Sequence, residues 1–468
     1  MAKITFDRFD LGIDLRKSAS VSDANRLREM KNAYVTTGLA TAKRPGLTKV
    51  ATLPSGSKGL FSAFGKLQVF SSTLPHPTLP GYDTSLINWN ELQDGLGAVK
   101  DVWFCDTFNG YLYVAIEYAD GTIKHHYLNG GLKTAISDSN CPHTKAVVKA
   151  ASKIFAVSSD GQTVRYSATG KCTDWTTAED AGFLPTGLNA RGDRETNALA
   201  LYRTYLVALS RDGAQVWTVN ADPSAMSLSD RVDNVGTAYP RTVVGVSGET
   251  YFLSDYGFRS IAQQVYLDSL TDVDVGSPID SLVRQTLRTM PAGTVPRAFY
   301  FYGTGQYVCC FGNHLYVYSQ SKTSKIAAWS EYFLSIEVEA VAQLGQTLYL
   351  RSGDTVYKLD DEATTDDGEQ FEVLITLPYL NFKRPGSLKH IYGLDAVVDG
   401  SCEISVGWDP RDPSAYTPEV KVSGNTRPGG MIPVECSGTD ISIRVRNFDD
   451  KPFQLNALTL YYEDEGEV

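Results

Sequence analysis

The chain has 468 residues, of which 42% are hydrophobic and 21% are charged, so it is globular and long enough for two or three domains. Its formal net charge is −11 and its isoelectric point is about 5.1. This charge argues against a protein that grips a nucleic-acid backbone, since such proteins present a basic surface that displaces counterions. It is compatible with an ordinary soluble surface, or with a wall past which nucleic acid slides.

The seven cysteines favour reduced thiols. They are odd in number and form no Cys-x-x-Cys pair, so we expect structural thiols in a protein made in a cytoplasm. Cys309 and Cys310 are adjacent in an expected strand, so their side chains should point to opposite faces. The first ten residues lack an apolar signal-peptide core, and no apolar run is long enough to cross a bilayer. We therefore expect neither a secretory signal nor a membrane span.

Residues 1–55 are expected to form a leader that is distinct from the rest of the chain. Ser22 can cap a short amphipathic helix over about 22–33, because apolar residues follow it at helical spacing. A strand with a turn at Thr37-Gly38 and a rigid Arg44-Pro45-Gly46 turn should come next. The leader carries too little apolar surface to fold alone. We expect it to pack on the body of its own chain or on a neighbouring subunit.

Residues 56–360 repeat one hairpin pattern. In the segment 153–175, alternating apolar residues flank Asp160-Gly161, and these two residue types tolerate the positive φ of a tight turn. A repeat of about 40–50 residues built from short strands is typical of a β-propeller. We therefore predict an all-β chain with a propeller of six or seven irregular blades. The turn glycines are Gly65, Gly121, Gly161, Gly213, Gly257, Gly312 and Gly353.

One segment inside this region predicts a helix. Ser277 can cap it, Pro278 suits its first position, and an apolar stripe runs from Ile279 to Met290. Arg284 and Arg288 are four residues apart and share a face. They are either solvated arginines on an insertion helix or part of a subunit contact.

The last hundred residues predict a separate β domain. Residues 361–370 are acidic and almost free of apolar side chains, so they are expected to be a linker. Residues 371–468 contain at least five short strands separated by turn-rich loops, which indicates a β-sandwich-like domain.

The sequence predicts no catalytic, cofactor-binding or metal-binding residues. It contains no nucleophile elbow and no phosphate-binding loop. The six histidines are scattered, and the adjacent His125 and His126 should face opposite sides of a strand and so share no metal. We therefore expect a protein that is not an enzyme.

The leader and the body together resemble the tail nozzle proteins of short-tailed bacteriophages, also called tail hub or packaged-DNA stabilisation proteins. The resemblance rests first on residues 9–16 (FDLGIDLR), 32–38 (NAYVTTG) and 43–46 (KRPG). Weaker matches lie in residues 165–183, 215–223, 252–257 and 378–389. The matched leader residues that are candidates for assembly are Gly12, Asp14, Arg16, Asn32, Gly38, Arg44, Pro45 and Gly46.

The resemblance implies a homo-hexameric ring below the portal and adaptor rings, with its propellers around a channel for DNA. Such a ring would retain the packaged genome and later release it. The implied partners are further copies of this chain, the adaptor or portal ring, a tail fibre, spike or needle protein, and double-stranded DNA that passes without sequence-specific binding. The implied location is the phage tail in the virion, after assembly in the host cytoplasm.

Two alternatives belong to other functional classes. A propeller glycosidase would need two carboxylates at the propeller axis about 5–10 Å apart. A receptor-binding tail component would use exposed aromatic loops, and residues 74–89 are rich in proline and aromatic residues.

Overall fold

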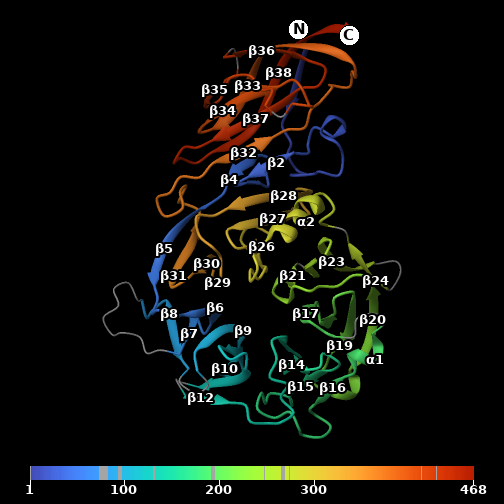
Figure 1. Cartoon of the computed structure of the whole chain (residues 1–468), viewed down its shortest axis with the longest axis vertical. Coiled ribbons are helices and arrows are strands. Elements are labelled where there is room, and N and C mark those ends of the chain that lie inside the picture. The colour runs from blue at the N-terminus through green and yellow to red at the C-terminus, as the bar shows by residue number, and fades with distance from the viewer. Residues whose placement is uncertain are drawn as a thin grey trace.

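The computed structural model describes residues 2–72, 83–92, 97–129, 132–190, 195–246, 248–264, 269–273, 275–412, 414–427 and 430–467 (Figure 1). Strands dominate this part of the chain. Its helical elements are α1 (Thr186–Asn189), α2 (Asp280–Thr289) and the 3-10 turns η1 (Ala19–Val21), η2 (Pro223–Ala225) and η3 (Pro240–Thr242). None of these helices has the length and apolar character that a membrane crossing requires.

Seven groups of strands, here called small sheets, follow one another along the chain, and their first strands occur in sequence order. Six are separate sheets, and the group over residues 297–333 is part of a larger, nine-stranded sheet. The first four sheets are β6 (Lys58–Ala63), β7 (Lys66–Ser71) and β8 (Ile87–Glu91); β9 (Val99–Phe108), β10 (Tyr111–Tyr118), β11 (Ile123–Asn129) and β12 (Leu132–Ala135); β13 (Val147–Ala150), β14 (Lys153–Val157), β15 (Val164–Tyr166) and β16 (Gly182–Leu184); and β17 (Ala198–Tyr202), β18 (Tyr205–Leu209), β19 (Gly213–Thr218) and β20 (Ser227–Asp233).

The remaining three sheets continue the same order. They are β21 (Val244–Val246), β22 (Glu249–Ser254), β23 (Gly257–Gln264) and β24 (Ser269–Val273); β25 (Arg297–Phe301), β26 (Gln306–Phe311), β27 (His314–Ser321) and β28 (Ile326–Phe333); and β29 (Ala340–Leu344), β30 (Thr347–Ser352) and β31 (Thr355–Asp360), completed by β5 (Gly46–Thr52).

The predicted turn glycines all join antiparallel neighbours within these sheets. Gly65 lies between β6 and β7, and the other six lie at the connection of the second and third strands of their sheets. Gly65 and five of these six glycines have a positive φ, a conformation that residues with a side chain rarely adopt. The hairpin repeat read from the sequence is therefore confirmed.

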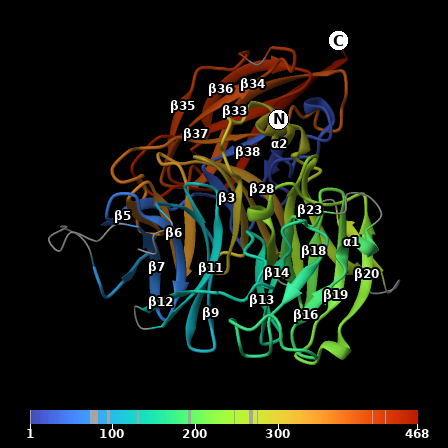
Figure 2. The ribbon, with the colours of Figure 1, turned by 60° about the horizontal axis from the view of Figure 1, so that its bottom comes forward.

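The seven sheets are arranged radially, which is the propeller type of fold expected from the sequence (Figures 1 and 2). Their first strands contact one another in a cyclic order: β6, β9, β13, β17, β21, β25, β29 and again β6. A cavity of about 290 Å³ is lined by residues from each of these strands or directly before them. It lies where the inner edges of the sheets meet.

The C-terminal region is a sandwich of two sheets, as predicted, but the leader supplies four of its strands. One sheet contains β1 (Ala2–Phe6), β3 (Ala33–Val35), β4 (Thr41–Lys43), β38 (Gln454–Glu467), β33 (Ser387–Asp399) and β36 (Ile432–Gly438). The facing strands are β2 (Glu29–Lys31), β32 (Val373–Thr376), β37 (Ser442–Asn447), β34 (Ser401–Gly407) and β35 (Val420–Ser423). Buried side chains of both sheets, such as Ile391, Leu458, Ile404 and Val445, share one core.

The short strand β2 joins the propeller to the sandwich. It pairs in parallel with β28 and antiparallel with β32, so one nine-stranded sheet runs through both parts of the chain. Backbone pairing on both edges of β2 therefore connects the two parts directly.

Three sequence-based expectations are wrong. The predicted helix at 22–33 does not form, because β2 pairs on both edges and the apolar spacing of Leu27 and Met30 serves the shared core instead. The propeller does not begin at residue 56, since β5 belongs to its last sheet. The acidic run 361–370 is not simply a solvated linker, because Asp366 is 2% exposed.

Other expectations are confirmed by packing. The helix expected after Ser277 is α2, and its apolar side lies on the core through Val283. It begins at Asp280 with Ile279 as its N-cap, so the expected cap at Ser277 and first position at Pro278 are wrong. Cys309 and Cys310 belong to two different core clusters, so they do face opposite sides of β26. Most of the aromatic segment 74–89 lies outside the described residues.

Candidate functional site

The three leader motifs that carry the family resemblance meet at one place, the junction of propeller and sandwich. Residues 12 and 13 lie beside Trp329 of β28, and residues 32 and 44 lie beside the end of β28 and the start of the sandwich. We call this region the leader junction. The leader therefore packs on its own chain, which is one of the two arrangements that its composition allowed.

Gly12 lies where a side chain would not fit. Its φ is +53°, and a Cβ at this position would be 2.5 Å from the carbonyl oxygen of Trp329. This close approach lets the amide of Ile13 donate to the same oxygen at 2.9 Å. Trp329 is in turn fixed by stacking on Phe258, with ring centres 4.8 Å apart, and by a hydrogen bond from its Nε1 to the Val275 carbonyl.

Asp14 and Arg16 connect the leader to the segment that precedes α2. The carboxylate of Asp14 is 2% exposed and accepts hydrogen bonds from Arg16, at 2.6 Å, and from Arg26. The amide of Leu15 donates to the Pro278 carbonyl at 2.8 Å, and Arg16 Nη1 lies 3.4 Å from the Ser277 hydroxyl. The structure thus brings the leader motif and α2 together, which the sequence did not reveal.

Arg44 is the centre of the leader junction and is 1% exposed. All five of its guanidinium N–H donors have acceptors, which satisfies a buried cation completely. Nη1 and Nη2 donate to the two carboxylate oxygens of Asp366 at 2.8 and 2.7 Å. The others donate to Asn32 Oδ1 and to the Pro45 and Phe333 carbonyls at 2.9–3.0 Å. The guanidinium also stacks on the Phe371 ring at 3.7 Å.

Asn32 connects the same network to the sandwich. Its amide nitrogen donates to the Glu372 carbonyl at 2.7 Å, and its Oδ1 also accepts from the Phe333 amide at 2.8 Å. The fold also requires glycine at position 46, because a Cβ there would lie 2.1 Å from the Thr365 carbonyl oxygen. Gly38 is different: its nearest neighbour would be 3.7 Å away, so the fold does not require glycine there.

Arg284 and Arg288 lie on the exposed side of α2, opposite the buried Val283. Arg284 Nε donates to the Asp280 carbonyl within the helix at 3.2 Å. Asp280 itself is held by Arg259 at 3.0 Å. The helix is therefore anchored through its first turn, and both arginine heads face away from the core.

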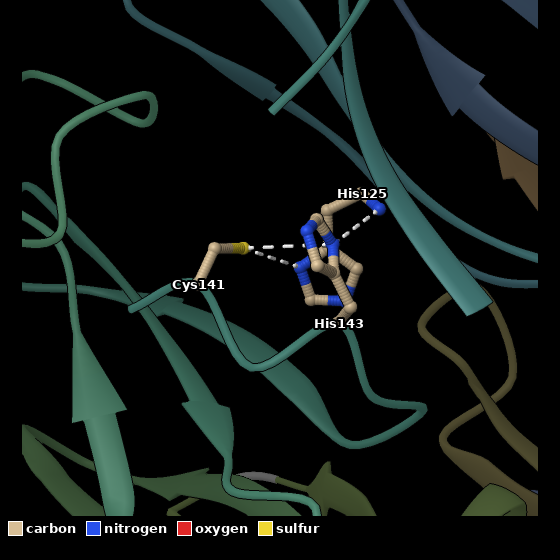
Figure 3. Close-up of side chains that lie close together, drawn as sticks. All are labelled: His125, Cys141 and His143. Atoms are coloured by element: carbon tan, nitrogen blue, oxygen red, sulfur yellow. Dashed lines mark hydrogen bonds between the residues drawn. The ribbon is translucent and has the colours of Figure 1, made fainter. Parts of the chain in front are cut away.

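A cluster that sequence reasoning missed lies between β11 and the loop that precedes β13. Figure 3 shows His125, Cys141 and His143 pointing toward one another. Cys141 Sγ is 3.5 Å from Nδ1 of His125 and 3.8 Å from Nδ1 of His143. The sequence signal is the Cys-x-His spacing of Cys141 and His143, which lies outside the adjacent pair His125 and His126. Those two do face opposite sides, since His125 contacts Tyr113 and His126 contacts Tyr118.

The histidine nitrogens of this cluster are already engaged in hydrogen bonds. Nε2 of His125 must be protonated, because it lies 2.8 Å from the Thr144 carbonyl, and Nδ1 then accepts from the Tyr113 hydroxyl at 2.7 Å. Nδ1 of His143 accepts from the backbone amide of His125 at 3.1 Å. Burial lowers the pKa of His125 to about 3 and raises the pKa of Cys141 to about 12. A thiophilic metal would have to displace these donors, so we interpret the cluster as a neutral part of the core.

Replacing Gly12 tests the contact between leader and propeller. We expect Gly12→Ala to lower the free energy of unfolding by about 1–3 kcal/mol more than Gly56→Ala does. Both glycines have a positive φ, but a Cβ on Gly56 meets nothing within 4 Å, so this matched control carries only the backbone penalty. Urea denaturation measures both, and equal losses would contradict the close approach to Trp329.

Replacing Arg44 tests the leader junction. Arg44→Met leaves Asp366 buried without its partner, so we expect a loss of about 3–5 kcal/mol of unfolding free energy. Adding Asp366→Leu should recover part of this loss, because no charge then stays buried. Arg16→Met is the control: Arg16 is half exposed and Asp14 keeps Arg26, so about 1 kcal/mol or less is expected. Similar losses for Arg44→Met and Arg16→Met would refute the central role of Arg44.

The neutral cluster predicts a pH dependence. The folded chain holds His125 neutral, whereas the unfolded chain binds a proton there at about pH 6.5. This contribution is fully present above pH 6.5 and is lost as the pH falls toward 3. We expect the drop in Tm between pH 7 and pH 4.5 to be smaller in His125→Gln than in the natural chain. Identical drops in His125→Gln and in the natural chain would contradict the assignment.

Comparisons with known proteins give structural likeness alone. No family model matches the chain, and no curated protein matches its sequence. Among solved structures, a catalytically inactive virginiamycin B lyase from Staphylococcus aureus with quinupristin is 11% identical with a TM-score of 0.39, over 67% of this chain and 98% of that one. A chain of a mitotic checkpoint complex is 11% identical with a TM-score of 0.39, over 75% and 93%. A chain of a Saccharomyces cerevisiae complex of Dbp5, Nup159, Gle1, IP6 and ADP is 10% identical with a TM-score of 0.38, over 73% and 99%. Likenesses of this size carry no inference about chemistry or partners.

Proposed function

We propose that this chain is a structural protein of a short phage tail, a nozzle or hub subunit that forms a ring and lines the passage for DNA. The observation that carries the proposal is the convergence of the three resembling leader motifs on the leader junction. Three separate segments of the leader that resemble one family thus serve one structural purpose. Arg44, the buried cation of this junction, contacts the propeller, the acidic run and the sandwich at once.

The propeller in this proposal has seven blades, one for each of the small sheets. The cyclic contacts of the first strands support a closed ring of blades. The leader strand β5 would complete the last blade, because it pairs along β31 as the outermost strand. This pairing of β5 with β31 would join the two ends of the propeller segment and cover the edge of β31.

The rigid connection between propeller and sandwich suits a mechanical role. The continuous nine-stranded sheet resists bending between the two parts. A subunit that withstands a packaged genome needs such stiffness, whereas an enzyme with a closing lid needs a hinge there.

The subunit contact would use the basic surface formed by Arg16, Arg284 and Arg288. A ring needs two different complementary patches on each subunit. The acidic run offers the second patch, since four of its carboxylates are exposed beside the buried Asp366: Asp361, Glu362, Asp367 and Glu369. In the proposed ring the basic surface of one subunit faces the acidic run of the next.

The carboxylates nearest the propeller axis favour a structural role over a glycosidase. Asp101 is held by Arg241 at 2.6 Å and by Arg297 at 3.3 Å. Burial opposes the ionisation of Glu117, but hydrogen bonds from Lys100, Trp103 and Lys145 outweigh it and lower its pKa. A glycosidase needs one carboxyl group that stays protonated, and a lowered pKa works against that.

We expect the purified chain to form six-fold rings with a central hole wide enough for duplex DNA. Electron micrographs and light scattering over a range of protein concentrations test this. The proposal fails if the chain stays a compact monomer at every concentration and in isolated phage particles.

The contact surface can be tested by charge reversal. We expect Arg284→Glu with Arg288→Glu to dissociate the ring without lowering the Tm of the subunit, because both side chains are exposed. Adding Asp361→Lys with Glu362→Lys should restore assembly through the swapped charges. The control pair Arg411→Glu with Lys421→Glu lies on the sandwich and should leave the ring intact. If the control pair dissociates the ring as much as Arg284→Glu with Arg288→Glu does, this contact is refuted.

A further inference from the structure

The cavity at the propeller axis carries positive charge that the composition of the chain does not suggest. Lys145, Arg241 and Arg297 all line it, and they come from three different sheets or the segments directly before them. The chain as a whole has a net charge of −11. Because the chain is acidic as a whole, a cluster of cations at the propeller axis indicates a role other than solubility.

The ion pairs around the cavity do not balance. Asp101 is shared by Arg241 and Arg297, and Glu117 is shared by Lys145 and Lys100 at 3.0 and 2.9 Å. Four cations thus share two carboxylates. The nearby Arg351 and Glu339 form a balanced pair at 2.8 Å, so they do not offset the excess. Lys100 is 58% exposed and does not line the cavity, so among the described residues the cavity lining keeps an excess of one positive charge.

Arg241 has a donor that the protein leaves unused. Its side chain is 10% exposed, and its Nε has no hydrogen-bond acceptor within the described residues. Its guanidinium lies 3.7 Å over the Trp103 ring, and Nη2 is held by Asp101. A buried donor without an acceptor costs free energy, so the described residues leave the Arg241 guanidinium incompletely satisfied.

Trp103 holds the charged groups in position. Lys145 Nζ lies 4.6 Å from the centre of the same indole ring, and the indole Nε1 donates to Glu117 at 2.7 Å. The ring is therefore fixed by a hydrogen bond and flanked by two cations. The cation heads are oriented before anything binds, which reduces the entropic cost of binding.

We propose that the axial cavity binds a small organic anion through a carboxylate or phosphate group. Arg241, Arg297 and Lys145 provide positive charge and N–H groups, which suit the oxygens of either group. The volume of about 290 Å³ admits a small metabolite and excludes a DNA duplex. Phe61 and Phe299 also line the cavity and offer an apolar surface for the rest of the molecule. This site is independent of ring assembly.

Titration calorimetry and thermal shift with inorganic phosphate and with citrate test the proposal, with sodium chloride at equal ionic strength as the reference. We expect at least one of the two anions to bind the natural chain with one anion per subunit and to raise its Tm. Phosphate and citrate distinguish the two head groups.

Two variants and one control locate the site. Arg241→Gln and Lys145→Gln should each weaken binding by about tenfold or more, the size of one charge-assisted hydrogen bond. Arg411→Gln removes one exposed charge from the sandwich and should bind as the natural chain does. Lys145 is 41% exposed, so Lys145→Gln should fold and tests the site even if Arg241→Gln does not fold. The proposal is overturned if neither anion stabilises the natural chain beyond chloride, or if the cavity variants bind as tightly as Arg411→Gln.

Discussion

The architecture depends on one buried ion pair, between Arg44 of the leader and Asp366 of the acidic run, 322 residues later in the chain. A buried charge is tolerated only when its partner and its hydrogen bonds are all present. Here the acceptors come from the leader, from the end of β28 and from the acidic run, so no one segment satisfies Arg44 alone. The pair therefore forms only when the leader, the propeller and the sandwich have all reached their final positions.

The strand β2 acts together with this pair. It supplies main-chain hydrogen bonds between propeller and sandwich, while Arg44 supplies side-chain bonds at the same boundary. Apolar contacts complete the junction, since the buried leader residues Phe9, Ile13 and Met30 belong to a core that the sandwich and α2 share. The proposed ring rests on this rigidity, because the basic surface of α2 and the acidic run are both fixed to the junction.

The hairpin repeat and α2 are predictable because they depend on local sequence. Elements that depend on long-range strand pairing are not predictable in this way. Gly161 and its equivalents mark turns through their own backbone requirement, and α2 is predictable from its apolar spacing, although it begins at Asp280 and Ser277 does not cap it. The residues after Ser22 have helical spacing too, but pairing with β28 and β32 overrides it. Asp366 could not be distinguished from its solvated acidic neighbours, because its partner lies in the leader. The approach of Cys141 to His125 likewise depends on how a loop closes.

A shared sheet also limits how such a subunit can move. Bending at the boundary of propeller and sandwich would break the pairing of β2 on at least one edge and expose the Arg44 guanidinium. The subunit therefore has no low-energy hinge at this boundary. In the proposed ring, the passage would therefore widen by rotating or tilting whole chains against one another, and the work of opening would be done at the contacts between neighbours.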